Sequence, residues 1–188
     1  MAQKASELLQ RWPEESREAA QLVVDQYGEP DEIPDFQMVW HRPGPCKRIV
    51  ASRTFYPHDF PTPHIDSVES FIDYRVPPEK VSELAAFDGS VVVERTAGEV
   101  SARCHDEQAN ALALNLVHDI VTGAKNVEEA RAYYAKEFLD FRRGLPTPYM
   151  EKLRVPPQGD QTADPDERVL SDADLEAAVQ EGERRGKP

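Results

Sequence analysis

The chain has 188 residues, a length typical of one domain, and 35 acidic against 22 basic residues give it a net charge of −13. Such an acidic surface repels phosphates and anionic lipid headgroups, so we expect no nucleic acid partner and no membrane partner. Two cysteines are too few for a disulfide framework. No signal peptide and no apolar run of about 18 residues is evident, which predicts a cytoplasmic protein.

The first part of the chain predicts an arm, a helix and a hairpin. We expect residues 1–11 to form a flexible arm. Pro13 and the acidic residues after it favour a helix start, and Gly28 is typical of a helix end. Residues 36–41 and 46–53 predict two strands joined by a Pro-Gly-Pro turn.

The middle of the chain is rich in helix-breaking residues. Three prolines among residues 54–65 predict an irregular loop, because proline suits neither a helix interior nor a central strand. Asp66 or Ser67 is then expected to cap a short helix that runs through Tyr74. A second short helix is expected over residues 79–87.

Residues 90–95 and 99–104 predict a second hairpin whose alternating residues give one apolar face and one polar face. Apolar residues cover more than half of a predicted helix over residues 107–122. Asn126 and Glu129 indicate a capping pair that starts another long helix. These elements predict an α+β fold in which antiparallel strands in two hairpins pack against helices on one side.

The composition changes after the last predicted helix. We expect residues 12–150 to form the domain and residues 151–188 to form an acidic, mostly disordered tail. Ser171 and Asp174 predict a cap for a short helix over residues 172–184 within that tail. Its exposed apolar side chains would suit a groove on a protein partner. They are Leu170, Leu175 and Val179.

Five stretches of the chain have a distinctive sequence. They are YGEPDE, MVWHRPGP, YPHDFPTPHID, IDYRVPPEKVSELAAFDGSVVVERT and SARC. Together they resemble a family of uncharacterised bacterial proteins over roughly residues 16–150. The resemblance implies a bacterial origin and assigns no activity, cofactor or catalytic residue.

The proline-rich stretch carries the first candidate site. His58, His64 and Asp66 combine imidazole and carboxylate groups, which suit Zn, Mn or Fe. The structural alternative is that Asp66 only caps the following helix. We expect no organic cofactor, and a divalent metal is the one cofactor that these residues would hold.

Two further groups are candidates for ligand binding. Glu94, Glu99 and Arg103 lie on the polar face of the second predicted hairpin, where two carboxylates beside an arginine could bind a polar ligand. Ordinary cross-strand ion pairs are the alternative explanation. Trp40 and His41 could form a binding platform, although a tryptophan at a strand end is more often buried.

The sequence leaves two functions open. It contains no Gly-rich phosphate loop, GxSxG or HExxH motif. The first hypothesis is therefore a non-enzymatic cytoplasmic binding or protein-interaction domain that uses its tail. The alternative is a metal-dependent enzyme or sensor that uses the His58, His64 and Asp66 cluster.

Overall fold

The structure, a computed structural model, describes residues 4–159 and 161–186. Five strands form one antiparallel sheet in the order β1-β2-β3-β5-β4. The strands are β1 (Gln37–His41), β2 (Arg48–His58), β3 (His64–Asp73), β4 (Val91–Glu94) and β5 (Glu99–Cys104). The predicted α+β class with antiparallel strands is confirmed, and the two expected hairpins belong to one continuous sheet.

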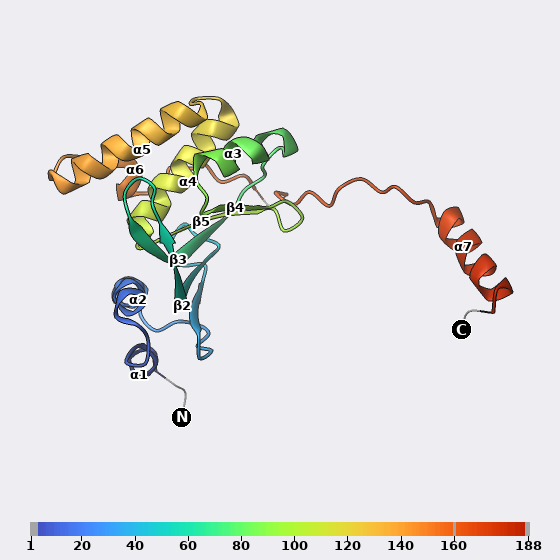
Figure 1. The fold of residues 1–188 in the computed structure, drawn as a ribbon, viewed down its shortest axis with the longest axis horizontal. Coiled ribbons are helices and arrows are strands. Elements are labelled where there is room, and N and C mark those ends of the chain that lie inside the picture. The colour runs from blue at the N-terminus through green and yellow to red at the C-terminus, as the bar shows by residue number, and fades with distance from the viewer. Residues whose placement is uncertain (1–3, 160, 187–188) are drawn as a thin grey trace.

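The helices form two groups over this sheet (Figure 1). One group is α1 (Ala5–Leu9) and α2 (Glu14–Tyr27), of which α2 packs on β2 and β3. The second group is 3₁₀ helix η1 (Pro78–Lys80), α3 (Val81–Phe87), α4 (Glu107–Thr122), α5 (Val127–Arg142) and α6 (Pro148–Glu151). Within this group α4 is central, because it contacts β3, β5, α3, α5 and α6.

Both helix groups bury the same face of the sheet. Met38, Ile49 and Val68 occupy that face beneath α1 and α2, whereas Ile72 and Val100 continue it beneath α4. Strand residues alternate between faces, so these side chains lie on one side and the charged residues between them lie on the other. The arrangement confirms helices on one side of the sheet.

The expected loop over residues 54–65 is wrong for most of its length. Residues up to His58 continue β2, and His64 already belongs to β3. Proline has no N–H for a neighbouring strand, but β1 pairs with β2 only as far as Ser52. Pro57 pairs with Ile65 on the β3 side alone, so β2 is an edge strand at that point and tolerates the proline.

The helix expected from Asp66 through Tyr74 is also wrong, because this stretch is strand β3. Asp66, Val68, Ser70 and Ile72 alternate along the buried face of the sheet and are at most 3% exposed. Two of these four buried residues are polar, and this hid the period of two from the sequence pattern.

Strands β4 and β5 form the second predicted hairpin with the predicted apolar and polar faces. The residues that lie opposite one another differ from those expected for a two-residue turn. A two-residue turn at Ala97-Gly98 would place Thr96 opposite Glu99, but Glu94 pairs with Glu99 and leaves a four-residue connection. The shift is an even number of residues, so Val91 and Val93 still share the apolar face with Val100.

The two ends of the chain contact the domain more than the sequence predicts. Leu8 and Leu9 of α1 are buried, so residues 5–9 are packed and do not form a flexible arm. Beyond α6, the side chain of Asp164 pairs with Arg95 at 2.7 Å, and its N–H donates to the Arg95 carbonyl. Residues just after the predicted boundary at 150 therefore contact the β4–β5 connection.

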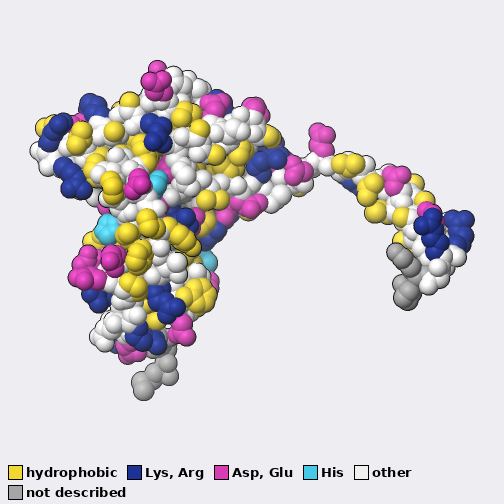
Figure 2. Space-filling view, in the orientation of Figure 1, with side chains coloured by type: hydrophobic (Ala, Val, Ile, Leu, Met, Phe, Trp, Pro, Cys, Tyr) yellow, Lys and Arg dark blue, Asp and Glu magenta, His cyan; other side chains and the backbone are white. Residues whose placement is uncertain are grey.

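Helix α7 (Asp172–Arg184) begins at the predicted cap, where Ser171 and Asp174 form a reciprocal capping box. No described residue of α7 is buried. Figure 1 shows α7 standing apart from the domain at the end of an extended segment, and Figure 2 shows hydrophobic side chains along its surface.

Candidate functional site

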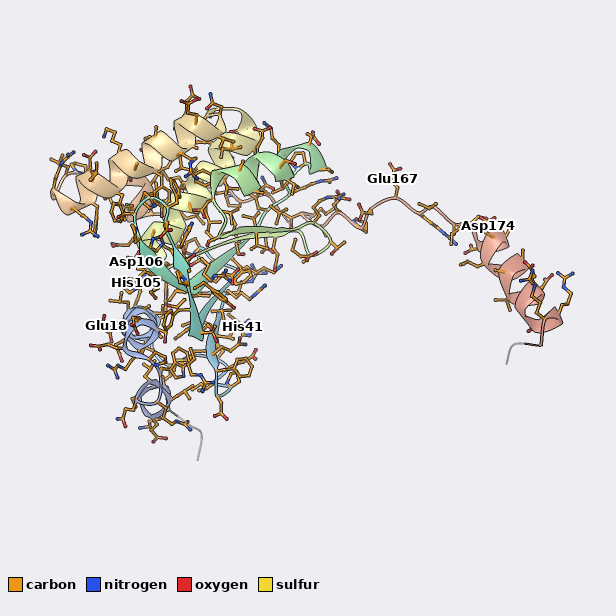
Figure 3. The ribbon with its side chains drawn as sticks, viewed as in Figure 1. Glu18, His41, His105, Asp106, Glu167 and Asp174 are labelled. Atoms are coloured by element: carbon orange, nitrogen blue, oxygen red, sulfur yellow. The ribbon has the colours of Figure 1, made fainter. Side chains whose placement is uncertain are left out.

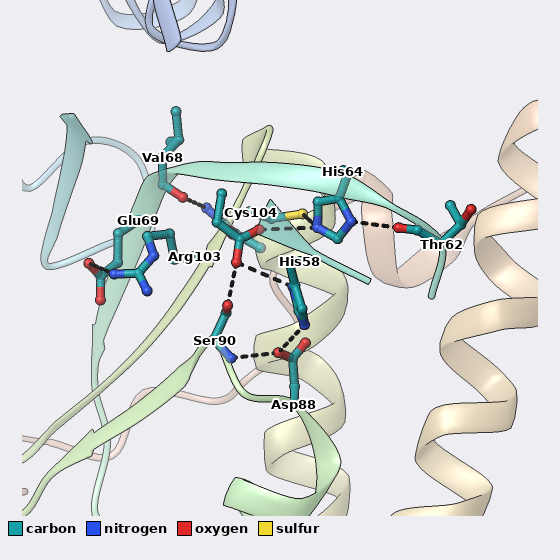
Figure 4. Close-up of polar contacts among 11 residues, drawn as sticks. His58, Thr62, His64, Val68, Glu69, Asp88, Ser90, Arg103 and Cys104 are labelled. Carbon is teal, nitrogen blue, oxygen red and sulfur yellow. Dashed lines mark hydrogen bonds and ion pairs between the residues drawn. The ribbon is translucent and has the colours of Figure 1, made fainter. Parts of the chain in front are cut away.

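The hairpin of β2 and β3 brings together the three residues of the predicted metal cluster. His58 at the end of β2 pairs directly with His64 at the start of β3. Directly opposed residues point to the same face, and so do residues two apart on a strand, which adds Asp66. One candidate ligand atom from each residue lies within 4.8 Å of the others. The predicted residues therefore converge, although they do so on strands and not in a loop (Figure 4).

Asp66 lies at the centre of the cluster and is 1% exposed. Its Oδ1 lies 3.1 Å from His64 Nε2, and its Oδ2 lies 3.2 Å from His58 Nδ1. Neither contact has the alignment of a hydrogen bond, so Asp66 Oδ1 and His58 Nδ1 are buried polar atoms without a hydrogen-bond partner among the described residues. Such atoms are costly unless something else satisfies them.

The outer contacts of the cluster hold its side chains in place. His64 Nδ1 lies 2.8 Å from the Thr62 carbonyl, and the Ser90 hydroxyl donates to Asp66 Oδ2. His58 Nε2 lies 3.6 Å from Asp88 Oδ1, which accepts the Ser90 N–H. The connection between α3 and β4 therefore orients a cluster that β2 and β3 build.

Burial and neighbouring charges both shift the pKa values of the residues in the cluster. The Asp66 carboxylate raises the pKa of His64 to about 11, with Cys104 as a second cause. Burial would raise the pKa of Asp66, but the contacts from His64 and Ser90 hold that pKa below its usual range. Burial also raises the pKa of Asp88. Without a metal, His64 is consequently an imidazolium paired with Asp66.

Cys104 at the end of β5 joins the cluster from a third strand. Its Sγ lies 3.3 Å from His64 Nε2, and the residue is 8% exposed. Burial raises the pKa of the Cys104 thiol. A protonated and buried thiol does not suit nucleophilic catalysis.

A pocket of about 280 Å³ lies beside the cluster. Its wall includes His64, Cys104, His105, Tyr134, Phe138 and Arg142. Figure 3 shows His105 and Asp106 just before α4, between α2 and the second helix group. An apolar pocket with a few polar groups is typical of small-ligand sites, and two residues of the cluster, His64 and Cys104, line this one.

The other predicted binding residues make separate contacts in the structure. The Trp40 indole is buried, and its Nε1 donates to the Gly28 carbonyl at 3.0 Å. His41 is exposed with its ring 2.6 Å from Glu32 Oε1 (Figure 3). Trp40 therefore belongs to the core and offers no platform beside His41.

The charged residues of the open sheet face are paired separately. Glu99 contacts Arg48 at 2.6 Å and Lys47 at 3.0 Å, and the Arg48 hydrogen bond lowers the pKa of Glu99. Arg103 pairs instead with Glu69 at 3.8 Å, and Glu94 accepts from Thr96. Glu94 lies opposite Glu99, but Arg103 pairs with neither of them, so cross-strand ion pairs describe this face better than a site shared by the three residues.

Three members of the cluster were missed from the sequence. Asp88 follows a predicted helix, and Ser90 and Cys104 begin and end a predicted hairpin, so none of the three carries a signal for a site. Alternation places Cys104 on the buried face, but only the pairing of β5 with β3 sets it near His64. Only the fold brings the connection before β4 next to the β2–β3 hairpin.

A second cavity, of about 260 Å³, lies between α2 and α4. The Tyr27 hydroxyl donates to Glu107 Oε1 at 2.6 Å, and Cys46 and Ser70 also line this cavity. The sequence offered no signal for this group, because Tyr27 and Glu107 are 80 residues apart.

Comparisons with protein-family models, curated proteins and solved structures found no match to this chain. Among residues 4–159 and 161–186, no helix combines the length and apolarity that crossing a bilayer requires.

Proposed function

We propose that this chain binds a divalent transition metal at His58, His64 and Asp66 and works as a metal-dependent sensor or enzyme. The observation that carries the proposal is the pair of buried atoms His58 Nδ1 and Asp66 Oδ1, which have no hydrogen-bond partner among the described residues. A bound cation would satisfy both atoms at once.

The spacing of the atoms also supports the proposal. Metal bonds of about 2.0 Å at the tetrahedral angle separate neighbouring ligand atoms by roughly 3.3 Å. The two contacts of Asp66 with the imidazoles measure 3.1 and 3.2 Å. These contacts involve the two different carboxylate oxygens, and the three ligand atoms lie within 4.8 Å of one another, so the side chains would move closer together around a metal.

The outer contacts supply the orientation that metal-binding histidines require. A ligating histidine usually donates its other ring N–H to a carbonyl or a carboxylate. The Thr62 carbonyl is positioned to accept this N–H from His64, and the Asp88 carboxylate is positioned to accept it from His58. Each imidazole would then direct its second nitrogen at Asp66.

A purely structural ion pair is the competing explanation. An imidazolium at His64 would neutralise Asp66 without any metal. That ion pair still leaves His58 Nδ1, which lies 3.2 Å from Asp66 Oδ2, without a hydrogen-bond partner among the described residues.

The test is metal binding by untagged protein that has been stripped with a chelator and titrated with zinc. We expect one zinc per chain after gel filtration, measured by mass spectrometry of the elements. His58→Ala and His64→Ala should each weaken zinc binding by about tenfold or more, since even outer-shell changes cost about 10–100-fold.

His41→Ala is the matched control, because it removes an exposed histidine from the same sheet. It should bind zinc as the wild type does. Equal zinc binding by the wild type and His64→Ala, with circular dichroism unchanged, would remove the proposal.

The second candidate is a cytoplasmic protein-interaction domain that uses α7. The supporting observation is the exposure of Leu170, Leu175 and Val179, which are 55%, 48% and 61% exposed. Glu176 and Glu183 flank the apolar residues of α7. The partner that fits is a protein with an apolar groove and a basic rim.

A further inference from the structure

We propose that Cys104 is the fourth ligand of the metal centre and that the complete set of two imidazoles, one carboxylate and one thiolate binds zinc. This inference rests on the proposed metal centre. It goes beyond that proposal because it names the metal and closes the coordination shell.

The sheet places the Cys104 thiol next to His64, one of the three proposed ligands. Cys104 pairs with Val68 across β5 and β3, and Val68 lies two residues from Asp66 on the same face. The Sγ atom therefore approaches the cluster from the strand beside Asp66 and lies 3.3 Å from His64 Nε2. Figure 4 shows the Cys104 sulfur directed at the His64 ring.

This distance is compatible with shared coordination. Zinc bonds of about 2.3 Å to sulfur and about 2.0 Å to nitrogen give a separation of roughly 3.5 Å at the tetrahedral angle. His64 Nε2 thus has two neighbours at nearly the tetrahedral edge length, Asp66 Oδ1 at 3.1 Å and Cys104 Sγ at 3.3 Å.

Asp88 is the alternative candidate for the fourth ligand, but its contacts direct it away from the proposed metal position. Its Oδ1 accepts the Ser90 N–H and faces His58 Nε2, whereas Asp66 lies beside the other nitrogen of His58. Asp88 is consequently a positioning residue for the His58 imidazole.

The chemical types of the four proposed ligands determine which metals the site would prefer. Thiolate and imidazole favour zinc and similar borderline-soft ions, whereas magnesium and calcium prefer oxygen ligands alone. Four protein ligands leave no position for a reacting water, which is typical of structural zinc sites. Within the proposed function, this set favours a zinc sensor over a hydrolytic enzyme.

The pocket beside the cluster supplies the access route. His64 and Cys104 both form part of its wall, so an ion in the pocket meets two of the four ligands directly. A metal site needs such a route as well as its ligands.

Cobalt(II) tests the inference, because a cobalt–thiolate bond gives a charge-transfer band in the near ultraviolet. Stripped wild-type protein titrated with cobalt should show this band together with the intense visible bands of tetrahedral cobalt. Cys104→Ser should lose the near-ultraviolet band and bind cobalt about tenfold or more weakly.

Cys46→Ser is the matched control, since Cys46 is also a buried free thiol but lines the other cavity. It should keep the band. Because Cys104→Ser could fail to fold, X-ray absorption of the wild-type zinc form gives an independent measurement, with one sulfur expected at about 2.3 Å.

The outcomes separate the two proposals. Cobalt binding without a thiolate band, or zinc without a sulfur neighbour, overturns the role of Cys104 and leaves the three-residue centre in place. A wild-type protein that binds neither cobalt nor zinc overturns both proposals.

Discussion

Glu107 lies in the first turn of α4. Its surroundings disfavour the charged form of its carboxyl group. Burial raises the pKa of Glu107, the Tyr27 hydroxyl opposes that effect, and the nearby Asp106 adds to it. Its Oε2 is buried without a hydrogen-bond partner among the described residues. Burial raises the pKa of the neighbouring Cys46 thiol to about 12. A neutral thiol supplies no positive charge to balance the Glu107 carboxylate.

This raised pKa predicts how stability depends on pH. The folded protein binds the Glu107 proton more tightly than the unfolded chain, whose glutamate pKa is about 4.3. The contribution to stability is therefore complete below that value and is lost as the pH rises through the folded-state pKa. Glu107→Gln keeps the acceptor for Tyr27 and should remove this loss, which urea unfolding between about pH 4 and pH 8 would measure.

Glu128→Gln is the control for this prediction. Glu128 also lies in the first turn of a helix, but it is exposed. The Glu128 variant should retain the wild-type pH dependence. A Glu107→Gln protein that loses stability with pH as steeply as the wild type would contradict the assignment.

At the scale of single elements, α7 differs from the other long helices because none of its described residues is buried. Its reciprocal capping box favours a helix, but an isolated helix of about 13 residues is marginal in water. Leu175 and Val179 lie on one face, four residues apart, and both are exposed. A partner that covers this face would bury them and stabilise the helix.

We expect the double variant Leu175→Glu/Val179→Glu to lose partners that the full-length protein recovers in a pull-down, because the charges would enter the partner's apolar groove. Ala173→Glu/Ala177→Glu is the control, since it adds the same charge on the opposite face of α7. Identical recovery by wild type and both variants would assign any interaction to the folded domain alone.

At the scale of the whole molecule, the folded unit extends beyond the boundary at 150. Asn115 on α4 donates to the carbonyls of Tyr149 and Lys152 and accepts the Arg154 N–H. Further along, Thr162 is buried, and Arg95 pairs with Asp164. These contacts attach described residues between α6 and Asp164 to the domain.

Limited trypsin digestion should therefore cut first after Arg168, which precedes the 92% exposed Val169. Cleavage after Lys152 or Arg154 should be slower, because proteolysis needs backbone released from its hydrogen bonds. Mass spectrometry of the early fragments identifies the order of cleavage. Asp164→Ala should accelerate the cut after Arg154, whereas first cleavage at Lys152 in the wild type would restore the boundary at 150.

The sequence alone determined the elements whose signals are local. Helix α4 has the predicted bounds, and α5 and α7 begin at the predicted capping residues Asn126 and Ser171. A cap and its first turn lie within four residues, and a helical stripe repeats every 3.6 residues, so both are readable without knowing the fold. The same holds for the two faces of the β4–β5 hairpin.

Only the tertiary structure decided where β2 and β3 extend and what surrounds the candidate site. Pro57 is compatible with β2 because β1 ends earlier, and β3 buries Asp66 because Ser90 and the two histidines meet it there. The composition of the proline-rich stretch identified the three candidate ligands, but pairing between distant strands added Cys104. Such pairing depends on contacts between residues far apart in the chain, and a local pattern of residue types does not contain them.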